Sequence, residues 1–347
     1  MKKDYIVFVG RFQPFHNGHM EVCKKALSIA NHLIIVVGSY KSACTIRNPW
    51  TFEERREMIE LALSEYKDRI TILPIRDYLY SDIRWITSLQ NIVTNTVPDN
   101  SSIGLIGHRK DDSSFYLDFF PQWDLYEEPN YHGINSTDIR RTYFNPRKSQ
   151  KENMDLTYIE ISRVPKQVID YLSTWAGNNE KYEYLTNEYK YIDEYKKKWD
   201  GAPYQPVFVT TDVVVVMNGH ILVVKRKVNP GKGLFALPGG FVNPNEKIED
   251  SMIRELKEET KIVYPIDKVK SFIVDTCVFD HPYRSLRGRT ITHAYFIHIK
   301  DNRPLPGVTG GDDAAEAMWM PINDVYMNED EFFEDHVHII THFVNKA

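Results

Sequence analysis

Cysteine is scarce in this sequence, and long apolar runs are missing. The 347 residues include three cysteines, Cys23, Cys44 and Cys277, which are odd in number and far apart. This usage excludes a disulfide framework and a CxxC metal site, so we expect a reducing compartment, the cytoplasm. No apolar run approaches the roughly 18 residues of a membrane-spanning helix. The apolar stretch near the start is shorter than the core of a secretory signal, so we expect neither a membrane anchor nor a signal peptide.

A strong excess of one charge is also lacking. The chain has 43 Lys and Arg against 48 Asp and Glu, which gives a formal net charge of −5. This balance argues against a broad nucleic-acid-binding surface, which is usually basic, although a small anionic substrate needs only a local basic pocket. With 42% apolar and 26% charged residues, the composition is that of a globular protein rather than a disordered, collagenous or coiled-coil chain. The length predicts two domains.

Short apolar runs alternate with helical patterns in the first half of the chain. The runs predict buried strands at residues 5–9, 33–39, 70–75 and 102–107. Apolar residues at helical spacing predict helices at residues 19–31, 51–66 and 85–93. Strands that alternate with helices indicate a parallel sheet covered on both faces. We therefore expect an α/β fold with a doubly wound, Rossmann-like sheet over residues 1–165.

The pattern changes after residue 165. Residues 166–203 carry aromatic side chains at helical spacing and end in a segment rich in helix breakers. We expect a helical linker that packs on a domain surface; a tyrosine-rich ligand surface is the alternative. Beyond it, two apolar runs flank Asn218-Gly219, a pair typical of a β-hairpin turn. Further patterns predict a helix, two strands and a terminal helix at residues 247–260, 270–279, 291–299 and 329–344. We expect a second domain over residues 204–347, an α/β/α sandwich with a mixed sheet.

A dense cluster of glycine, arginine and histidine lies where the first predicted strand meets the first predicted helix. Gly10 and Gly18 allow a close approach of the backbone, and the free N–H groups of a helix N-terminus attract an anion. His16 and His19 are three residues apart and can face the same side of one helical turn, and Arg11 adds a fixed cation. These features suit the binding of a polyphosphate during an in-line displacement, in which catalysis is mainly positioning and charge stabilisation.

A second candidate phosphate site lies near residue 135. Asn135, Ser136 and Thr137 are residue types that cap the start of a helix. The first turn of that helix, together with Arg140, would cradle the β- and γ-phosphates of a nucleotide. An ordinary capped surface helix is the alternative for this segment taken by itself.

The segment at residues 10–19 reads GRFQPFHNGH. It resembles the GRFQPxHxGH signature of the archaeal-type nicotinamide-nucleotide adenylyltransferases, which belong to the HxGH nucleotidyltransferase superfamily. Further segments resemble the same family in the same order: RNPWT at 47–51, followed by Glu54-Arg55, GHRKD at 107–111 and INSTDIR at 134–140. The last matches the signature ISxTxxR, except that Asn135 stands where serine is usual. The resemblance spans roughly residues 1–150.

This resemblance implies a reaction and a set of residues. The phosphate of nicotinamide mononucleotide would attack the α-phosphorus of ATP to give NAD and pyrophosphate, with Mg²⁺ carried mainly by the ATP phosphates. The implied catalytic residues are His16, His19 and Arg140. Those implied for ATP and phosphate binding are Gly10, Arg11, Phe12, Gln13, Gly18, Gly107, Asn135, Ser136 and Thr137. Those implied for nicotinamide mononucleotide are Arg47, Asn48, Trp50, Asp77 and Trp85. A core position is the alternative for Trp85.

Three glutamates share one helix face in the second half of the chain. Glu255, Glu258 and Glu259 stand at positions i, i+3 and i+4. Carboxylates so close repel one another unless cations hold them, and hard oxygen ligands favour Mg²⁺ or Mn²⁺. A metal cluster there can bridge a pyrophosphate and generate hydroxide, and a backbone carbonyl at Gly239 or Gly240 would complete the coordination. A solvated acidic helix face is the alternative.

The segment from Gly240 to Ile262 resembles the Nudix box, Gx5Ex7REUxEExGU, at every specified position but one. Lys261 stands where the box has glycine. Because lysine is poorly suited to a left-handed helix cap, we expect a local change at that helix end rather than a loss of catalysis. Arg254, within the box, is expected to orient a glutamate by ion pairing.

Two later segments indicate the substrate. Arg284, Arg287 and Arg289 form a basic stretch that would bind the phosphates of ADP-ribose. The loop from Gly310 to Glu316 resembles the late loop of Nudix ADP-ribose pyrophosphatases. Glu316 would then be a further metal ligand or a general base; a solvated acidic loop is the alternative. ADP-ribose is the expected substrate, with AMP and ribose 5-phosphate as products.

The two halves together resemble bacterial bifunctional nicotinamide-mononucleotide adenylyltransferase/Nudix hydrolases. We expect one enzyme of NAD metabolism with two independent sites and nucleotides as partners, without a nucleic-acid or membrane partner; a homo-oligomer is left open. One alternative makes the second domain a non-hydrolytic sensor of ADP-ribose. Another changes the substrates, to pantetheine phosphate, FMN or a nicotinic-acid nucleotide in the first site and to NADH or a dinucleoside polyphosphate in the second. A nucleic-acid-binding protein is the remaining alternative.

Overall fold

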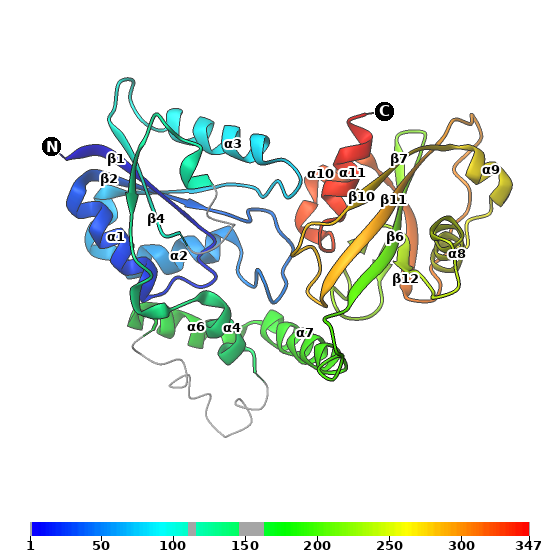
Figure 1. Ribbon diagram of the computed structural model, residues 1–347, viewed down its shortest axis with the longest axis horizontal. Coiled ribbons are helices and arrows are strands. Elements are labelled where there is room, and N and C mark those ends of the chain that lie inside the picture. Colours follow the sequence, from blue (N-terminus) through cyan, green and yellow to red (C-terminus); the bar gives the residue numbers. More distant parts are fainter. Residues whose placement is uncertain (1, 110–115, 146–162, 347) are drawn as a thin grey trace. The chain divides into compact units, whose positions relative to one another are not determined.

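A computed structural model describes residues 2–109, 116–145 and 163–346 of the chain. The chain divides into two compact units, Met1–Tyr189 and Lys190–Ala347 (Figure 1). All three cysteines are free. None of the helices in the described ranges combines the length and the apolar character that a membrane crossing requires.

The first unit is built on a five-stranded parallel sheet in the order β3-β2-β1-β4-β5. The strands are β1 (Lys3–Gly10), β2 (Ala30–Val37), β3 (Ile70–Pro74), β4 (Ile103–Gly107) and β5 (Asp124–Glu127). The apolar runs predict the first four. They miss β5 because this edge strand has four residues, none of them buried, with an acidic residue at each end.

Alternate residues of these strands face opposite layers of helices. The helices next to the sheet are α1 (Asn17–Ile29), α2 (Phe52–Ala62) and α3 (Asp82–Thr94). Ile6 and Phe8 of β1 pack in one core with residues of α1 and α2, whereas Val7 lies in another core with Leu89 of α3. Figure 1 shows α1 and α2 on one face of the sheet and α3 on the other. This is the doubly wound arrangement that the sequence predicts.

Side chains fix the starts of several helices in this unit. Thr51 caps α2, and the carboxylate of Glu54 accepts the Thr51 amide in return. Ser81 caps α3, and Asn135 caps α4 (Ser136–Tyr143). The predicted helix at 51–66 ends at Ala62 instead, and the chain continues as a 3₁₀ helix, Ser64–Arg69.

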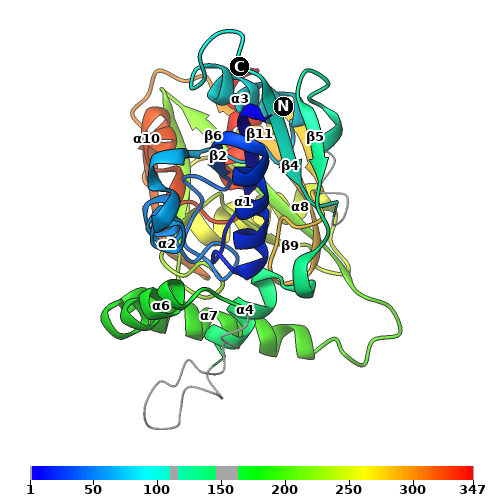
Figure 2. The ribbon, with the colours of Figure 1, turned by 90° about the vertical axis from the view of Figure 1, so that its left-hand side faces the viewer.

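The two helices after Pro165 pack on the core of the first unit. α6 (Lys166–Asn178) buries Leu172 there, and α7 (Glu180–Lys197) buries Leu185. The hydroxyl of Tyr143 in α4 donates to the Leu172 carbonyl oxygen at 2.7 Å, and α4 and α6 lie side by side (Figures 1 and 2). The part of the expected linker up to Tyr189 is therefore continuous with the first unit.

The second unit is built on a mixed sheet with the main order β10-β11-β6-β7-β12. Its strands are β6 (Val207–Met217), β7 (His220–Arg226), β8 (Phe235–Ala236), β9 (Gly239–Phe241), β10 (Ile273–Phe279), β11 (Arg289–Ile299) and β12 (Ala314–Pro321). β6 and β7 form the predicted hairpin, with Asn218 and Gly219 at φ values of 49° and 73°, as its two-residue turn requires. β11 runs parallel to β6, and its other neighbour, β10, is antiparallel to it.

Helices cover both faces of this sheet. They are α8 (Ile248–Thr260), α9 (Ile266–Ser271), α10 (Ile322–Met327) and α11 (His336–Val344). Val213 and Val215 of β6 pack in one core with Leu256 of α8, whereas Val214 packs in another core with Ile340 of α11. The expected α/β/α sandwich with a mixed sheet is confirmed.

Some element boundaries in the second unit differ from the prediction. The first two residues of the predicted strand at 270–279 belong to α9, and β10 starts at Ile273. The predicted helix at 329–344 is divided into a 3₁₀ turn, Glu329–Glu331, and α11. The prediction also misses β12. Its first half is a run of alanines around Glu316, a composition that favours helix over strand.

Candidate active sites

The N-terminus of α1 holds two imidazole rings face to face. Nδ1 of His16, the N-cap residue, accepts the backbone N–H of His19 at 3.3 Å, and Nδ1 of His19 accepts the N–H of His16 at 3.3 Å. The ring centroids lie 3.6 Å apart, with the planes inclined by 17°. Because each Nδ1 is an acceptor, each neutral ring carries its proton on Nε2. Burial, and then the charge of His16, lowers the pKa of His19 well below its usual value, so this ring is neutral at pH 7 and carries an Nε2–H donor.

Two glycines leave room for this pair of rings. A Cβ on Gly18 would lie 3.1 Å from the ring of His16, and one on Gly10 would lie 2.8 Å from the ring of Phe12. Phe12 has a φ of 51°, and its ring centroid lies 4.8 Å from that of His19. These three residues of the predicted site thus set the position of the histidines.

Arg140 of α4 reaches into the same region. The residue is 7% exposed, and its guanidinium donates to the carbonyl oxygens of Gln13 at 2.6 Å and Ile46 at 2.9 Å. Burial, followed by the charges of Arg11 and Arg47, lowers the pKa of Arg140 to about 9. The charges of Arg11 and Arg47 therefore oppose that of Arg140, and an anion bound near Arg140 would relieve this repulsion.

The start of α4 contacts the segment before α1. Asn135 is its N-cap, as predicted. The hydroxyl of Ser136 donates to the Pro14 carbonyl oxygen at 3.2 Å, and the hydroxyl of Thr137 accepts from Arg140 at 3.3 Å. The two predicted phosphate-binding motifs therefore belong to one site.

The loop between β2 and α2 is fixed to the same segment. The side-chain amide of Gln13 donates to the Trp50 carbonyl oxygen at 2.9 Å and accepts the Trp50 N–H at 3.1 Å. The ring of Trp50 differs from the expectation of a ligand contact: it is 1% exposed and packs against Phe144 and Trp175, so it belongs to the core. Asn48 has a buried Oδ1 atom with no hydrogen-bond partner in the described chain, which leaves one acceptor available to a ligand.

Arg55 of α2 joins the ends of two strands, a role that the motif analysis does not give it. Its guanidinium donates to the carbonyl oxygens of Arg11 at 2.8 Å, Gly38 at 2.6 Å and Ser39 at 3.3 Å. Burial lowers its pKa to about 10. The pair Glu54-Arg55 that follows the RNPWT segment is the only signal in the sequence, because nothing in a helical pattern distinguishes a buried arginine from a solvated one.

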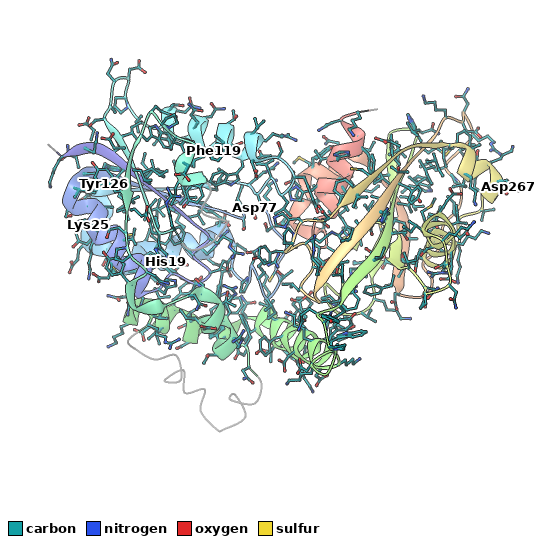
Figure 3. All side chains as sticks on the ribbon, in the orientation of Figure 1. His19, Lys25, Asp77, Phe119, Tyr126 and Asp267 are labelled. Atoms are coloured by element: carbon teal, nitrogen blue, oxygen red, sulfur yellow. The ribbon has the colours of Figure 1, made fainter. Side chains whose placement is uncertain are left out.

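The expected residues on the nicotinamide side lie after β3 and on α3. The carboxylate of Asp77 accepts the N–H of Ser39 at 3.1 Å and its hydroxyl at 2.7 Å. Asp77 and His19 are both labelled in the first unit in Figure 3. Trp85 is half-buried, with its ring 5.3 Å from that of Tyr116. Gly107 ends β4, and positions 110 and 111 of the GHRKD segment lie outside the described residues.

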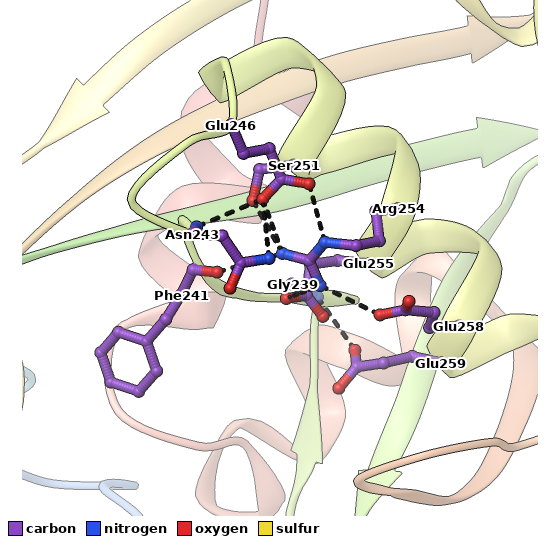
Figure 4. A network of polar contacts seen from close by, with 9 residues as sticks. All are labelled: Gly239, Phe241, Asn243, Glu246, Ser251, Arg254, Glu255, Glu258 and Glu259. Carbon is purple, nitrogen blue, oxygen red and sulfur yellow. Dashed lines mark hydrogen bonds and ion pairs between the residues drawn. The ribbon is translucent and has the colours of Figure 1, made fainter.

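In the second unit, glutamates gather around Arg254 on α8 (Figure 4). The guanidinium donates to Glu246 at 2.8 and 2.9 Å, to Glu255 at 2.7 Å and to Glu258 at 3.0 Å. Hydrogen bonds from Arg254 lower the pKa of Glu246 to about 2. Arg254 thus orients the glutamates by ion pairing, as the sequence predicts.

Gly239 and Gly240 pack against this cluster without room for a side chain. A Cβ on Gly240 would lie 2.4 Å from a carboxylate oxygen of Glu255, and one on Gly239 would lie 2.1 Å from the Thr211 carbonyl oxygen. The N–H of Gly239 donates to Glu259 at 2.9 Å. Glu259 is 7% exposed, and burial, with the charge of Glu255 adding to it, raises its pKa to about 8. A cation placed among these carboxylates would lower that pKa and be bound in turn.

Lys261 adopts the left-handed conformation that glycine commonly has after a helix. Its φ and ψ are 45° and 34°, in the left-handed region, and its N–H donates to the Lys257 carbonyl oxygen at 2.9 Å. The expected local change is therefore not seen in the backbone. The side chain is the difference, with its Cε 2.8 Å from the place that a Cβ on Gly311 would take.

The three arginines of the basic stretch have different surroundings. Arg284 is 4% exposed and pairs through two hydrogen bonds, of 2.9 and 2.8 Å, with the buried carboxylate of Asp335. Contrary to the expectation, its guanidinium is therefore not open to a phosphate. Arg289 donates to a backbone carbonyl oxygen of the turn after β10. Arg287 lies 4.9 Å from the ring centroid of Phe241, and its buried Nε has no hydrogen-bond partner among the described residues.

Arg226, at the end of β7, is a further cation that acts on Glu259, and the motifs do not indicate it. Its guanidinium lies 4.1 Å from the ring centroid of Phe333, and its Nε donates to the Pro230 carbonyl oxygen at 2.9 Å. Burial, and then the charge of Arg287, lowers its pKa, and its own charge opposes the rise in the pKa of Glu259. In the sequence it stands between two lysines, a pattern typical of a solvated strand end.

Glu316 lies in a strand where the sequence predicts a loop. It is exposed on β12, in register with Lys225 of β7. Across residues 2–109, 116–145 and 163–346, no three His, Cys, Asp or Glu side chains converge as a ready-made metal site. Glu255 and Glu258 are each paired with Arg254, so a cation bound there would share those carboxylates with the guanidinium.

Comparisons with known proteins divide the chain in the same way. The family model described as cytidylyltransferase-like matches residues 7–142, and the NUDIX domain model matches residues 207–343. The chain is 35% identical over 194 residues to the nicotinamide/nicotinic acid mononucleotide adenylyltransferase of Acinetobacter baylyi, which covers 55% of this chain and 96% of that protein. It is 38% identical over 117 residues to the ADP-ribose pyrophosphatase of Methanocaldococcus jannaschii, which covers 34% of this chain and 63% of that protein.

Solved structures extend the likeness to the full length. The crystal structure of a bifunctional NMN adenylyltransferase/ADP ribose pyrophosphatase from Francisella tularensis matches with a TM-score of 0.92 at 36% identity, over 99% of both chains. A second structure of such a Francisella tularensis enzyme, complexed with AMP and a manganese ion, matches with a TM-score of 0.90 at 36% identity, again over 99% of both chains.

Proposed function

Because the chain belongs to the family of bifunctional NMN adenylyltransferase/ADP-ribose pyrophosphatases, we propose that it is an enzyme with two active sites. The first unit transfers AMP from ATP to nicotinamide mononucleotide (NMN), which gives NAD and pyrophosphate. The second unit hydrolyses ADP-ribose to AMP and ribose 5-phosphate.

The transfer is supported chiefly by the stacked pair His16 and His19, together with the buried guanidinium of Arg140, which donates to the Gln13 carbonyl oxygen in the segment before α1. An oxygen of the NMN phosphate forms a bond to the α-phosphorus of ATP, and the bond from that phosphorus to the bridging oxygen breaks as pyrophosphate leaves. The Nε2–H groups of the histidines donate to phosphate oxygens, on which negative charge builds up. Arg140, Thr137 and the N–H groups at the start of α4 hold the β- and γ-phosphates.

NMN binds against the loop between β2 and α2 and the residues after β3. Arg47 supplies a cation and Asn48 a buried acceptor. The half-buried ring of Trp85 offers a surface on which the pyridinium can stack, and Asp77 supplies a carboxylate. The ring of Trp50 takes no part, because it lies in the core.

The hydrolysis is supported chiefly by the buried carboxylates of α8 beside the backbone of Gly239 and Gly240. Burial raises the pKa of Glu259 to about 8, which indicates that its carboxylate lacks a full counter-charge. Glu255, Glu258 and Glu259 all supply hard oxygen donors. These residues therefore fit a divalent cation. We propose Mg²⁺, with Mn²⁺ as a substitute. When bound, the cation would supply a Lewis acid for the diphosphate and an activated water.

The remaining residues of the second site bind and orient. Arg254 holds Glu255 and Glu258 in place. Arg287, whose buried Nε has no hydrogen-bond partner among the described residues, and Arg226 bind the diphosphate of ADP-ribose. Glu316, exposed on β12, is the candidate general base.

One experiment tests both assignments. The purified protein with Mg²⁺ is assayed for NAD formed from NMN and ATP, and separately for AMP released from ADP-ribose. His19→Ala is expected to lower kcat for NAD synthesis by about 10²-fold or more and to leave AMP release intact. Glu259→Gln should lower kcat for AMP release and leave NAD synthesis intact. Glu249→Gln removes a charge from an exposed position of the same helix and should change neither activity.

The outcomes separate the alternatives. Wild-type protein that forms no NAD overturns the transferase assignment. Wild-type protein that binds ADP-ribose but releases no AMP overturns the hydrolase assignment and identifies the second unit as a sensor. AMP release that is unchanged in Glu259→Gln would show that the hydrolytic site lies elsewhere.

A further inference from the structure

We infer that Glu188 of α7 is a positioning residue of the transferase site, so that the helix pair α6–α7 is part of this site rather than a passive connection. The inference rests on the function proposed for the first unit. Glu188 has an exposed fraction of 0%, and its Oε2 accepts the backbone N–H of Ile46 at 2.9 Å. A carboxylate buried this completely is costly unless its hydrogen bonds compensate, which implies a role for the contact.

Ile46 is held at both of its backbone polar groups by distant side chains. Its N–H is bound by Glu188, and its carbonyl oxygen accepts Nε of Arg140 at 2.9 Å. The far end of the same loop is fixed where Gln13 forms two hydrogen bonds with the backbone of Trp50. The backbone between these two anchors carries the residues proposed to bind NMN.

Those residues are Arg47 and Asn48. One hydrogen bond within their loop is a weak one, from Sγ of Cys44 to the Pro49 carbonyl oxygen at 3.5 Å. The Thr45 N–H reaches the Asn48 carbonyl oxygen at 3.4 Å, and the Thr45 hydroxyl accepts the Asn48 N–H at 3.4 Å, both long contacts. The anchor at Ile46 therefore fixes the backbone position from which the side chains of Arg47 and Asn48 extend, and the direction in which they point.

The helix that carries Glu188 is itself fixed. Leu185, one turn earlier, is fully buried in the core of the first unit. The hydroxyl of Tyr182 donates to the Tyr143 carbonyl oxygen at 2.9 Å. On α6, the indole N–H of Trp175 donates at 2.6 Å to Glu54, which caps the helix at the end of the same loop. The pair α6–α7 therefore holds the loop at Ile46, through Glu188, and also holds α2, the helix that follows the loop, through Trp175.

Steady-state kinetics on three variants test this role. Glu188→Ala leaves a buried N–H unpaired, so we expect the KM for NMN to rise about ten-fold. The KM for ATP should stay within about two-fold, and ADP-ribose hydrolysis should not change. Glu188→Gln keeps an oxygen acceptor and should remain close to wild type. Glu183→Ala removes an exposed carboxylate from the same helix and serves as the matched control.

Two results overturn the inference: an unchanged KM for NMN in folded Glu188→Ala, or equal losses for NMN and ATP together with a fall in melting temperature. If Glu188→Ala does not fold, Glu188→Asp, which is shorter by one methylene, provides the same comparison. Wild-type protein without NAD synthesis would refute the proposed function, whereas normal wild-type synthesis with an unaffected variant would refute only the role of Glu188.

Discussion

Glu259 keeps a carboxyl group in a place where its charge is poorly tolerated. Burial raises its pKa to about 8, whereas a glutamate in an unfolded chain titrates near 4.3. Between roughly these two pH values, the folded metal-free protein holds a proton that the unfolded chain has released. The free energy of unfolding of the metal-free protein therefore falls as the pH rises through this window. A divalent cation takes the place of the proton and reverses the fall.

We predict that wild-type protein in a chelator loses melting temperature from about pH 5 to pH 8 relative to Glu259→Gln, whose amide does not ionise. Mg²⁺ added at the upper end of the range should restore the wild type and have little effect on the variant. Thermal melting at several pH values measures both effects. A difference between the two proteins that is independent of pH would contradict the assignment.

We predict that substitution of Arg284 lowers the stability of the second unit, whereas substitution of Arg287 weakens the binding of ADP-ribose. Arg284→Ala would remove both of the hydrogen bonds that the guanidinium donates to the buried carboxylate of Asp335, which is expected to cost about 3–5 kcal/mol in the free energy of unfolding. Arg287→Ala removes a guanidinium that stacks on Phe241, worth about 1 kcal/mol or less, but should raise the KM for ADP-ribose about ten-fold. Urea unfolding of both variants measures the change in stability, and steady-state kinetics measure the change in the KM for ADP-ribose. An Arg284→Ala protein of normal stability would show that the buried pair contributes nothing.

Among the secondary-structure elements, α8 and β9 meet without space for a methyl group. Gly240→Ala would place a Cβ 2.4 Å from the Glu255 carboxylate. The displaced glutamate is expected to lower kcat/KM for ADP-ribose by about 10²-fold, with NAD synthesis unchanged. Gly307→Ala is the control, because nothing lies within 4 Å of a Cβ there. Equal activity of both variants would mean that Glu255 tolerates displacement.

The C-terminal end of α8 offers a gain in stability. Lysine at a φ of 45° is strained by about 1 kcal/mol relative to glycine. Lys261→Gly should therefore raise the free energy of unfolding by up to about 1 kcal/mol, and ADP-ribose hydrolysis should persist because the backbone already has the required form. Chemical denaturation and the AMP assay test the two statements. A loss of hydrolysis would instead assign the lysine side chain a part in catalysis.

The elements also show what the sequence can predict. Central strands, the hairpin and the start of α4 follow from local signals: apolar runs, a two-residue turn and capping side chains. β5 and β12 have no such signal, because one is a short polar edge strand and the other begins among alanines. The burial of Trp50 and of Arg284 depends on packing with distant segments; Asp335, the partner of Arg284, lies 51 positions away. Sequence motifs therefore predict where the sites lie but not which of their side chains are accessible to a ligand.

For the molecule as a whole, the two-enzyme organisation could be predicted, because each half of the sequence carries its own set of motifs. The comparisons confirm this organisation, with one family model matching each half and a bifunctional enzyme matching the whole chain. The independence of the two sites is a separate prediction. Glu259→Gln protein saturated with ADP-ribose, which it is expected to bind without turnover, should show kcat and KM values for NAD synthesis within about two-fold of those without ADP-ribose. A larger change in either constant would reveal coupling between the sites.

The parallel pairing of β11 with β6 also determines when the second unit can complete its folding. β6 and β7 are joined by a two-residue turn and can pair within microseconds. β11 can pair with β6 only after the whole chain from Met217 to Arg289 has been made and has looped back, and such distant pairings form slowly. During synthesis, α8 and its glutamates therefore leave the ribosome before the strand that completes the centre of their sheet. The transferase unit can already be folded by then, so that each new chain acquires the capacity to make NAD before the capacity to hydrolyse ADP-ribose.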